Sequence, residues 1–351
     1  RWVRAGERSE LMFHALEPYR LTLHRYGRER EFVRILGWWD EHGPDANQQI
    51  TPDGDYTQTG VRFNKVGYGN PHHTQMVTAP ARSGLYYVEA ESESGAFFAA
   101  PWVIAPAAGS VPGGAIAVVL STNTWNAYNN FGGRSNYVNA TGLPPEPTVY
   151  GRQELTRYKP QSAADWASPD EAFLPLTFER PEPFNSVPRG ARPEDPIAGR
   201  QPNHLAPAEW RLLAWLEREG FGYDVYSDAQ LDDGTLDLDA YRVVMISAHP
   251  EYWTKRAFER TLGWVEQRGG HFVYLGGNGI NAEVELLDGA TRMHVKSHLA
   301  AVNGSLGQPD PAHPSRWFDS RFHRATGIPE ARLLGVATTE TGIMTAAPYR
   351  A

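Results

Sequence analysis

From residue 115 onward, apolar runs alternate with amphipathic segments, and this alternation limits the fold more than any other feature of the chain. The run AIAVVL is continuously apolar, which is typical of a strand covered on both faces. Strands are predicted at 115–120, 222–228 and 242–248, a further strand with its exit loop at 271–279, and helices at 207–220 and 252–270. Because strands that alternate with helices form parallel sheets, the region is expected to be a doubly wound, flavodoxin-like sheet of the amidotransferase-like kind.

The part of the chain before this alternation is predicted to be all-β. Short segments rich in β-branched and aromatic residues are separated by Gly, Pro, Asp and Ser at 19–27, 31–39, 73–80, 84–92 and 97–106. Such spacing favours an immunoglobulin-like β-sandwich over residues 1–108, followed by an α/β catalytic domain over 109–351. A Pro-rich insertion at about 141–206 is too long for an ordinary connection, which predicts a functional segment or a lid.

Composition excludes several classes of function. The chain has no cysteine, so thiolate metal sites and cysteine nucleophiles are excluded. Its net charge is -8 with dispersed Lys and Arg, which argues against nucleic acid as a partner. No apolar run reaches the roughly 18–20 residues that cross a bilayer, so no membrane partner and a cytoplasmic location are expected. Since the chain begins with Arg rather than Met, its sequence leaves open whether residues precede it.

Polar loops follow three of the predicted strands. They are STNTWNAYNNFGGRSNY (121–137), HPEYW (249–253) and GGNG (276–279). Ligands of doubly wound sheets bind outside the carboxyl ends of the strands, near the point where the strand order reverses. We therefore expect phenol, imidazole, carboxylate and carboxamide groups from these loops to converge at one edge of the sheet.

Each of these side chains also has a purely structural explanation. Tyr128 and Tyr137 could be half-buried packing residues, and His249 could cap the helix that follows it. Glu251 lies just before the helix predicted from 252, where a carboxylate gains roughly 0.3–1 kcal/mol from the helix dipole. Asn278 could satisfy its own backbone within a tight glycine turn. The functional interpretation depends on the three loops being unusual together.

The motifs of several hydrolase classes are missing. The chain has no G-x-S-x-G nucleophile elbow and no H-E-x-x-H zinc motif. His294 and His298 are the nearest to a metal-binding pair, but no third ligand is evident in the sequence. Two phenols and a carboxylate instead suit a hard, highly charged cation such as ferric iron.

Four motifs in the order TWNAYNNFGGRSNY, LTFERP, HPEYW and LGGNG resemble the large (beta) subunit family of N,N-dimethylformamidase, an iron-dependent amidohydrolase. The segment SGLYYVEAES with PWVIAP is also similar, and the resemblance covers about residues 10–340. It implies a mononuclear Fe(III) site made by two tyrosines and one glutamate, with a histidine and an asparagine nearby. By motif, Tyr128 and Glu251 correspond to metal ligands, and His249 and Asn278 correspond to the catalytic neighbours.

The second tyrosine ligand is matched less directly. The motif GGRSNY makes Tyr137 the candidate, with Tyr150 and Tyr158 as alternatives. The chain departs from the family in lacking the long interruption between the two tyrosines and in ending earlier.

The resemblance implies hydrolysis of a small N-substituted amide, such as N,N-dimethylformamide, to acid and amine. It also implies a small subunit as partner, and a homo-oligomer is a further expectation. Two other classes of function stay open. A metal-free glycoside hydrolase would need a second carboxylate, such as Glu283 or Glu179, roughly 5–10 Å from Glu251. A non-catalytic protein would use the aromatic surface and the β-sandwich to bind carbohydrate or a partner.

Overall fold

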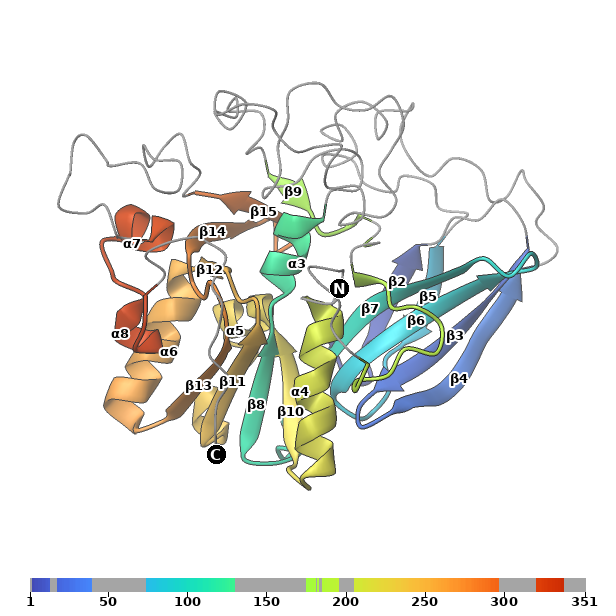
Figure 1. The fold of residues 1–351 in the computed structure, drawn as a ribbon, viewed down its shortest axis with the longest axis horizontal. Helices are drawn as coiled ribbons and strands as arrows, with labels where there is room; N and C mark the ends of the chain where they lie inside the picture. Colours follow the sequence, from blue (N-terminus) through green and yellow to red (C-terminus); the bar gives the residue numbers. More distant parts are fainter. Residues whose placement is uncertain are drawn as a thin grey trace.

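The computed structural model describes residues 2–12, 18–39, 74–129, 175–180, 182, 185–195, 205–296 and 320–337. Figure 1 shows two regions side by side, a strand-rich N-terminal part and a region of strands and helices. Within the described residues, no helix is long and apolar enough to cross a membrane.

The N-terminal region consists of strands. β1 (Trp2–Arg4), β7 (Phe97–Ala105), β6 (Gly84–Ser92), β3 (Tyr19–Tyr26) and β4 (Arg30–Trp39) form a five-stranded sheet in that order, and β2 (Arg8–Met12) pairs with β5 (Thr74–Thr78). The five predicted strands are therefore confirmed, and two short ones were missed. The sandwich arrangement and the boundary at residue 108 stay predictions.

The α/β region contains the expected parallel sheet. The strand order is β10 (Tyr223–Ser227), β8 (Ile116–Leu120), β11 (Val243–Ala248) and β13 (His271–Gly276), and every pair is parallel. Alternate side chains of β8 enter different cores: Val118 packs in the core that contains α4 (Ala206–Arg218), and Val119 packs in the core that contains α6 (Lys255–Arg268). The sheet is therefore covered on both faces.

The strand order of this sheet reverses between β8 and β11. β8 is followed by β10 on one side, whereas β11 lies on its other side and is followed by β13. These two neighbouring strands form the switch point at which ligands bind in open α/β sheets. A second sheet, of order β12 (Tyr252–Thr254), β14 (Ala282–Leu287), β15 (Arg292–Val295) and β9 (Leu176–Thr177), lies beyond the carboxyl ends of β8 and β11 (Figure 1).

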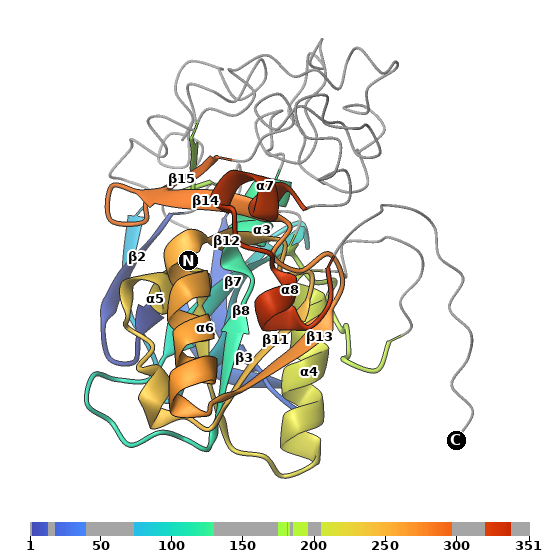
Figure 2. The same ribbon diagram turned by 90° about the vertical axis from the view of Figure 1, so that its left-hand side faces the viewer.

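Short helices complete the described part. They are α3 (Thr122–Tyr128), α5 (Asp228–Asp233), the 3-10 helix η8 (Leu238–Ala240), α7 (Arg321–Thr326) and α8 (Ala331–Leu334). Figure 2 shows α7 next to β14, with α8 near α6. Most of the predicted insertion at 141–206 lies outside the described residues, so its role as a lid stays a prediction.

Two predicted elements are corrected. The segment 121–137, predicted to be a loop throughout, begins with helix α3. Its sequence favours helix weakly, but buried carboxylates accept its first N–H groups: Glu209 accepts from Ser121 at 2.8 Å and Asp228 accepts from Asn123 at 2.9 Å. The tertiary structure thus supplies the stabilisation that the local sequence lacks.

The helix predicted at 252–270 begins only at Lys255. Residues 252–254 form β12, which pairs with β14, and the Thr254 hydroxyl accepts the N–H of Ala257 at 3.0 Å. Thr254 is therefore the N-cap, and the prediction that Glu251 immediately precedes the helix is wrong.

Candidate metal and catalytic site

Tyr128 is the last residue of α3, which rises from the carboxyl end of β8. The hydroxyl of Thr124, one turn earlier, accepts the backbone N–H groups of Glu251 at 3.0 Å and Tyr252 at 3.2 Å. This contact joins α3 to the loop after β11. The two loops on either side of the switch point are therefore held in a fixed relation.

The Tyr128 site consists of three side chains from these loops: Tyr128, His249 and Glu251. The Tyr128 hydroxyl donates to Glu251 Oε2 at 2.8 Å and lies 2.8 Å from His249 Nε2. His249 Nε2 is in turn 3.3 Å from Glu251 Oε2. A phenol, an imidazole and a carboxylate thus converge on one point, as the sequence predicted for this edge of the sheet.

Exposure differs within the Tyr128 site. Tyr128 is 4% exposed and Glu251 is 1% exposed, whereas the His249 side chain is 21% exposed. The phenol and the carboxylate are therefore shielded from water. The imidazole is the group of the three that solvent or a substrate can reach.

The second oxygen of Glu251 is held by two residues that sequence reasoning missed. Arg321 donates to Glu251 Oε1 at 2.6 Å, and Asn281 donates to it at 3.2 Å. Arg321 starts α7, and Asn281 follows the glycine-rich loop after β13. Asn281 lies three residues beyond the asparagine of the GGNG motif, a proximity that could have drawn attention to it; nothing in the sequence around Arg321 marks it.

These partners determine the protonation state of Glu251. Burial alone would raise the pKa of this carboxyl group. The hydrogen bond from His249, the positive charge of Arg321 and the hydrogen bond from Tyr128 outweigh burial and lower the pKa to about 2. Glu251 is therefore anionic near neutral pH. Its carboxylate accepts hydrogen bonds from side chains rather than from the first N–H groups of a helix, so it is not a helix cap.

The loop after β13 packs tightly against the loop that contains His249. Gly277 N–H donates to the Ala248 carbonyl at 3.1 Å, and Ile280 N–H donates to the Pro250 carbonyl at 2.8 Å. A Cβ on Gly276 would lie 2.8 Å from the Ala248 carbonyl oxygen, so this glycine is required by the close approach of the two loops.

Asn278 lies in that second loop. Its Oδ1 is buried without a hydrogen-bond partner among the described residues. Ala248, Asn278 and Ile280 all have positive φ angles, of 60°, 55° and 49°, which are uncommon outside glycine. Such strain often accompanies functional loops, and the unpaired oxygen points to a group that Asn278 would bind.

Other candidates are placed differently or lie outside the described residues. Tyr137, Tyr150, Tyr158 and His298 lie outside them. His294 is on β15 opposite Glu285. The described contacts of Glu251 include neither Glu179 nor Glu283, so the glycosidase carboxylate pair stays a prediction. Among the described residues, no three or more His, Cys, Asp or Glu side chains gather into a metal-binding group.

Comparison with known proteins identifies the family of this chain. A family model described as "N,N-dimethylformamidase beta subunit-like, C-terminal" matches residues 35–351. The chain belongs to this family. The matched residues include both loops of the switch point, so Tyr128, His249 and Glu251 all lie within the dimethylformamidase beta subunit-like region.

Two curated relatives share shorter regions of similarity. The N,N-dimethylformamidase beta subunit of Alcaligenes sp is 34% identical over 100 residues, which are 26% of this chain and 13% of that protein. The N,N-dimethylformamidase beta subunit of Paracoccus aminophilus is 33% identical over 94 residues, 24% of this chain and 12% of that protein. The alignments thus span about an eighth of the relatives' length.

Proposed function

We propose that this chain hydrolyses a small amide at a mononuclear ferric site. The observation that supports the proposal best is that the Tyr128 hydroxyl contacts both the ionised Glu251 carboxylate and His249. The tyrosine and the glutamate are both buried. The family's printed name, N,N-dimethylformamidase beta subunit-like, supports amide hydrolysis as the reaction, with an N-substituted amide such as N,N-dimethylformamide as the substrate class.

The donor set fits a hard trivalent cation. A phenol is a good ligand once the cation displaces its proton, and a carboxylate is anionic already. Arg321 and Asn281 occupy Glu251 Oε1, so Oε2, which faces the Tyr128 hydroxyl, is the oxygen that would bind the metal. Tyr137 is proposed as the second phenolate, with Tyr150 and Tyr158 as alternatives.

When bound, ferric iron would supply the Lewis acidity that a neutral amide requires. His249 is placed to move protons, because Nε2 is next to the Glu251 carboxylate and the ring is partly exposed. Its imidazole would take a proton from the attacking water, and the carboxylate beside Nε2 would stabilise the resulting imidazolium. The water oxygen then bonds to the amide carbon, the C–N bond breaks, and the imidazolium returns the proton to the leaving amine.

Asn278 would act on the carbonyl oxygen. Its carboxamide NH2 group can donate to the negative charge that develops on that oxygen, and its unpaired Oδ1 can accept from the substrate or a water molecule. Arg321 and Asn281 would orient Glu251 without touching the reacting atoms.

We also propose a more specific architecture and an assembly for this chain. The parallel sheet has the spatial order β10, β8, β11, β13, so its strands lie in the order 2-1-3-4 when numbered along the chain. This order supports a flavodoxin-like, amidotransferase-like arrangement. The two N-terminal sheets support a β-sandwich: Val77 of β5 and Leu21 of β3 share one apolar core. Because the relatives are named beta subunits, we also propose a small partner subunit, with a homo-oligomer as a further assembly.

Substitution of Tyr128 by phenylalanine tests the metal site. We expect purified wild-type protein to contain about one iron per chain and to show a broad visible charge-transfer band from phenolate to Fe(III). Tyr128→Phe should weaken or shift the band and reduce iron content. Tyr226→Phe, which removes another buried hydroxyl that bonds Tyr241, is the matched control and should change neither. Unchanged iron and spectrum in Tyr128→Phe would exclude Tyr128 as a ligand.

Single phenylalanine substitutions at 137, 150 and 158 identify the second ligand. We expect Tyr137→Phe to abolish iron binding and the other two to retain it. Loss of iron in Tyr150→Phe or Tyr158→Phe alone would move the assignment to that residue and leave the iron proposal intact.

A further inference from the structure

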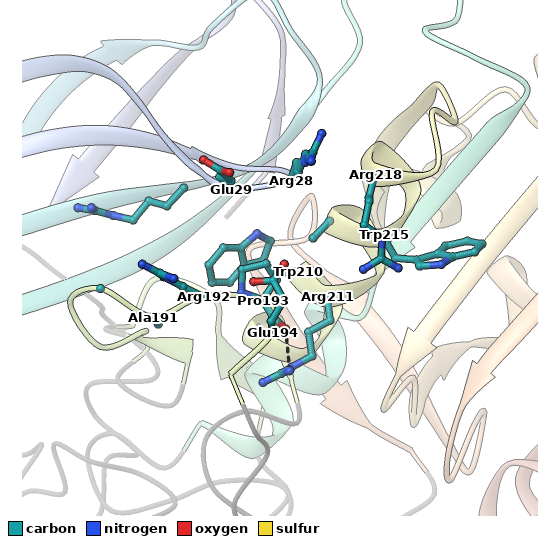
Figure 3. A pocket seen from close by; sticks show the side chains of 13 residues that line it. Arg28, Glu29, Ala191, Arg192, Pro193, Glu194, Trp210, Arg211, Trp215 and Arg218 are labelled. Carbon is teal, nitrogen blue, oxygen red and sulfur yellow. Dashed lines mark hydrogen bonds between the residues drawn. The ribbon is translucent and has the colours of Figure 1, made fainter. Parts of the chain in front are cut away.

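A hollow of about 650 Å³ lies between the turn joining β3 to β4 and the outer surface of α4 (Figure 3). It is called the arginine cleft here, because five of its lining residues are arginines and two are glutamates. The arginines are Arg28, Arg30, Arg192, Arg211 and Arg218. None of the residues that line it belongs to the Tyr128 site.

Several of these arginines lack a carboxylate partner. Arg30 pairs with Glu89, and Arg218 forms an exposed pair with Glu219 at 3.0 Å. Within the described part of the chain, the guanidinium groups of Arg28, Arg192 and Arg211 form no ion pair. The protein as a whole carries a net charge of -8, whereas the lining of this hollow has five arginines against two glutamates.

The cleft is built on fixed side chains. Arg211 donates to the Pro193 carbonyl at 2.7 Å, while its Nε is buried and has no hydrogen-bond partner in the described region. Trp210 donates to the Gly27 carbonyl at 2.7 Å, and its ring lies 4.6 Å from that of Tyr26. A donor that is already oriented loses little conformational freedom on binding, which favours recognition of an anion.

The spacing of the cations indicates the kind of anion. Arg211 and Arg218 are seven residues apart on α4, which is about 10 Å along a helix. Arg28 and Arg192 come from two other segments, the β3–β4 turn and the loop 190–194. Cations that are distributed in this way match several carboxylates along an extended chain, in which residues rise about 3.3 Å each, better than one compact phosphate group.

The two glutamates of the cleft favour a peptide over a nucleic acid. Glu29 and Glu194 are both exposed. Their negative charges would repel a continuous row of phosphates. A peptide, in contrast, offers backbone N–H groups, which can donate hydrogen bonds to the two glutamates.

We propose that the arginine cleft docks an extended acidic peptide segment of a partner polypeptide. Charge complementarity supports this occupant, and the proposal does not depend on the iron site. Peptide carboxylates would pair with Arg28, Arg192 and Arg211, and the apolar parts of the segment would pack on Trp215, whose side chain is exposed.

The probe is a fluorescently labelled ten-residue peptide of alternating glutamate and alanine, titrated with the full chain and followed by fluorescence anisotropy. We expect saturable binding that weakens with added salt and at least about tenfold weaker binding to Arg28→Glu/Arg192→Glu, because reversed charges repel the peptide. Arg211→Gln should also weaken it. Arg260→Glu, an exposed charge reversal on α6, is the control and should bind as the wild type does.

Several outcomes would overturn the proposal. They are wild-type affinity in the double variant and in Arg211→Gln, equal binding of a glutamine–alanine peptide, and full displacement of the peptide by equimolar pyrophosphate or by a ten-nucleotide single strand. Either displacement would identify a phosphate site rather than a peptide-docking site. Arg28 and Arg192 are exposed, so the double variant should fold as the wild type does, and circular dichroism checks this directly.

Discussion

Replacement of Arg321 by glutamine removes the cation that faces the buried Glu251 carboxylate. The two side chains are joined at 2.6 Å, and their exposures are 14% and 2%. Removal of one partner from a buried ion pair typically costs about 3–5 kcal/mol, since the other charge stays buried. Asn281 and His249 would still contact Glu251. We therefore expect Arg321→Gln to lower the free energy of unfolding by about 3 kcal/mol, near the bottom of that range.

The assay is urea denaturation of metal-depleted protein at pH 7. Arg332→Gln is the matched control, because Arg332 forms an exposed pair with Glu266 at 2.9 Å and such pairs contribute about 0–1 kcal/mol. The double variant Arg321→Gln/Glu251→Gln should lose less than the sum of the single changes, because the two groups interact directly. If Arg321→Gln costs no more than Arg332→Gln, or if the two changes are additive, the argument that Arg321 holds Glu251 fails.

Three further predictions test the surroundings of the site. Gly276→Ala should lower both activity and stability, because its Cβ would lie 2.8 Å from a backbone oxygen. Gly277→Ala is the control and should behave as the wild type does, since its Cβ would meet nothing within 4 Å. Turnover and denaturation measure both variants, and equal effects would refute the prediction. Burial raises the pKa of Glu209 to about 7, so the folded chain keeps a proton that the unfolded chain releases above about pH 4.5. The free energy of unfolding of the wild type, relative to that of Glu209→Gln, should therefore fall by up to about 3 kcal/mol between pH 4.5 and 7. Parallel curves of stability against pH for the two proteins would contradict this prediction. His249→Ala should keep its iron and lose amide turnover by at least about a hundredfold, as expected of a base that acts on water; loss of iron would make His249 a ligand instead.

Much of the parallel sheet was predictable because its strands are continuous apolar runs. The run AIAVVL predicted β8 to within one residue, and RVVMISA predicted β11 equally well. The order of the loops then followed from the rule that parallel strands present their carboxyl ends at one edge. The loops that contain Tyr128, His249 and Glu251 are therefore expected at one edge from the sequence, and the family resemblance singles out these three residues.

Helix α3 could not be predicted in this way. TNTWNAY contains threonines and asparagines that favour helix weakly, and all seven residues are buried. Its first turn depends on Glu209 and Asp228, which come from α4 and α5. Local sequence carries no sign of partners so distant along the chain.

Arg321 and β12 were missed for related reasons. Arg321 is 70 residues from the glutamate that it contacts, and no spacing rule relates the two. The apolar pattern of α6 continues backward through Tyr252 and Trp253, so the helix was extended over residues that pair with β14 instead. Both errors concern long-range contacts, which decide where an element begins and which charge a buried carboxylate meets.

The central claim is that Glu251 holds iron, and the iron content of Glu251→Gln tests it most directly. The change replaces an anionic oxygen by a weak neutral donor while keeping the shape of the side chain. With a native circular dichroism spectrum, the variant should lose its iron, measured by elemental analysis, and its visible band, while the wild type keeps about one iron per chain. Retention of iron and of amide turnover by Glu251→Gln would contradict the proposed site.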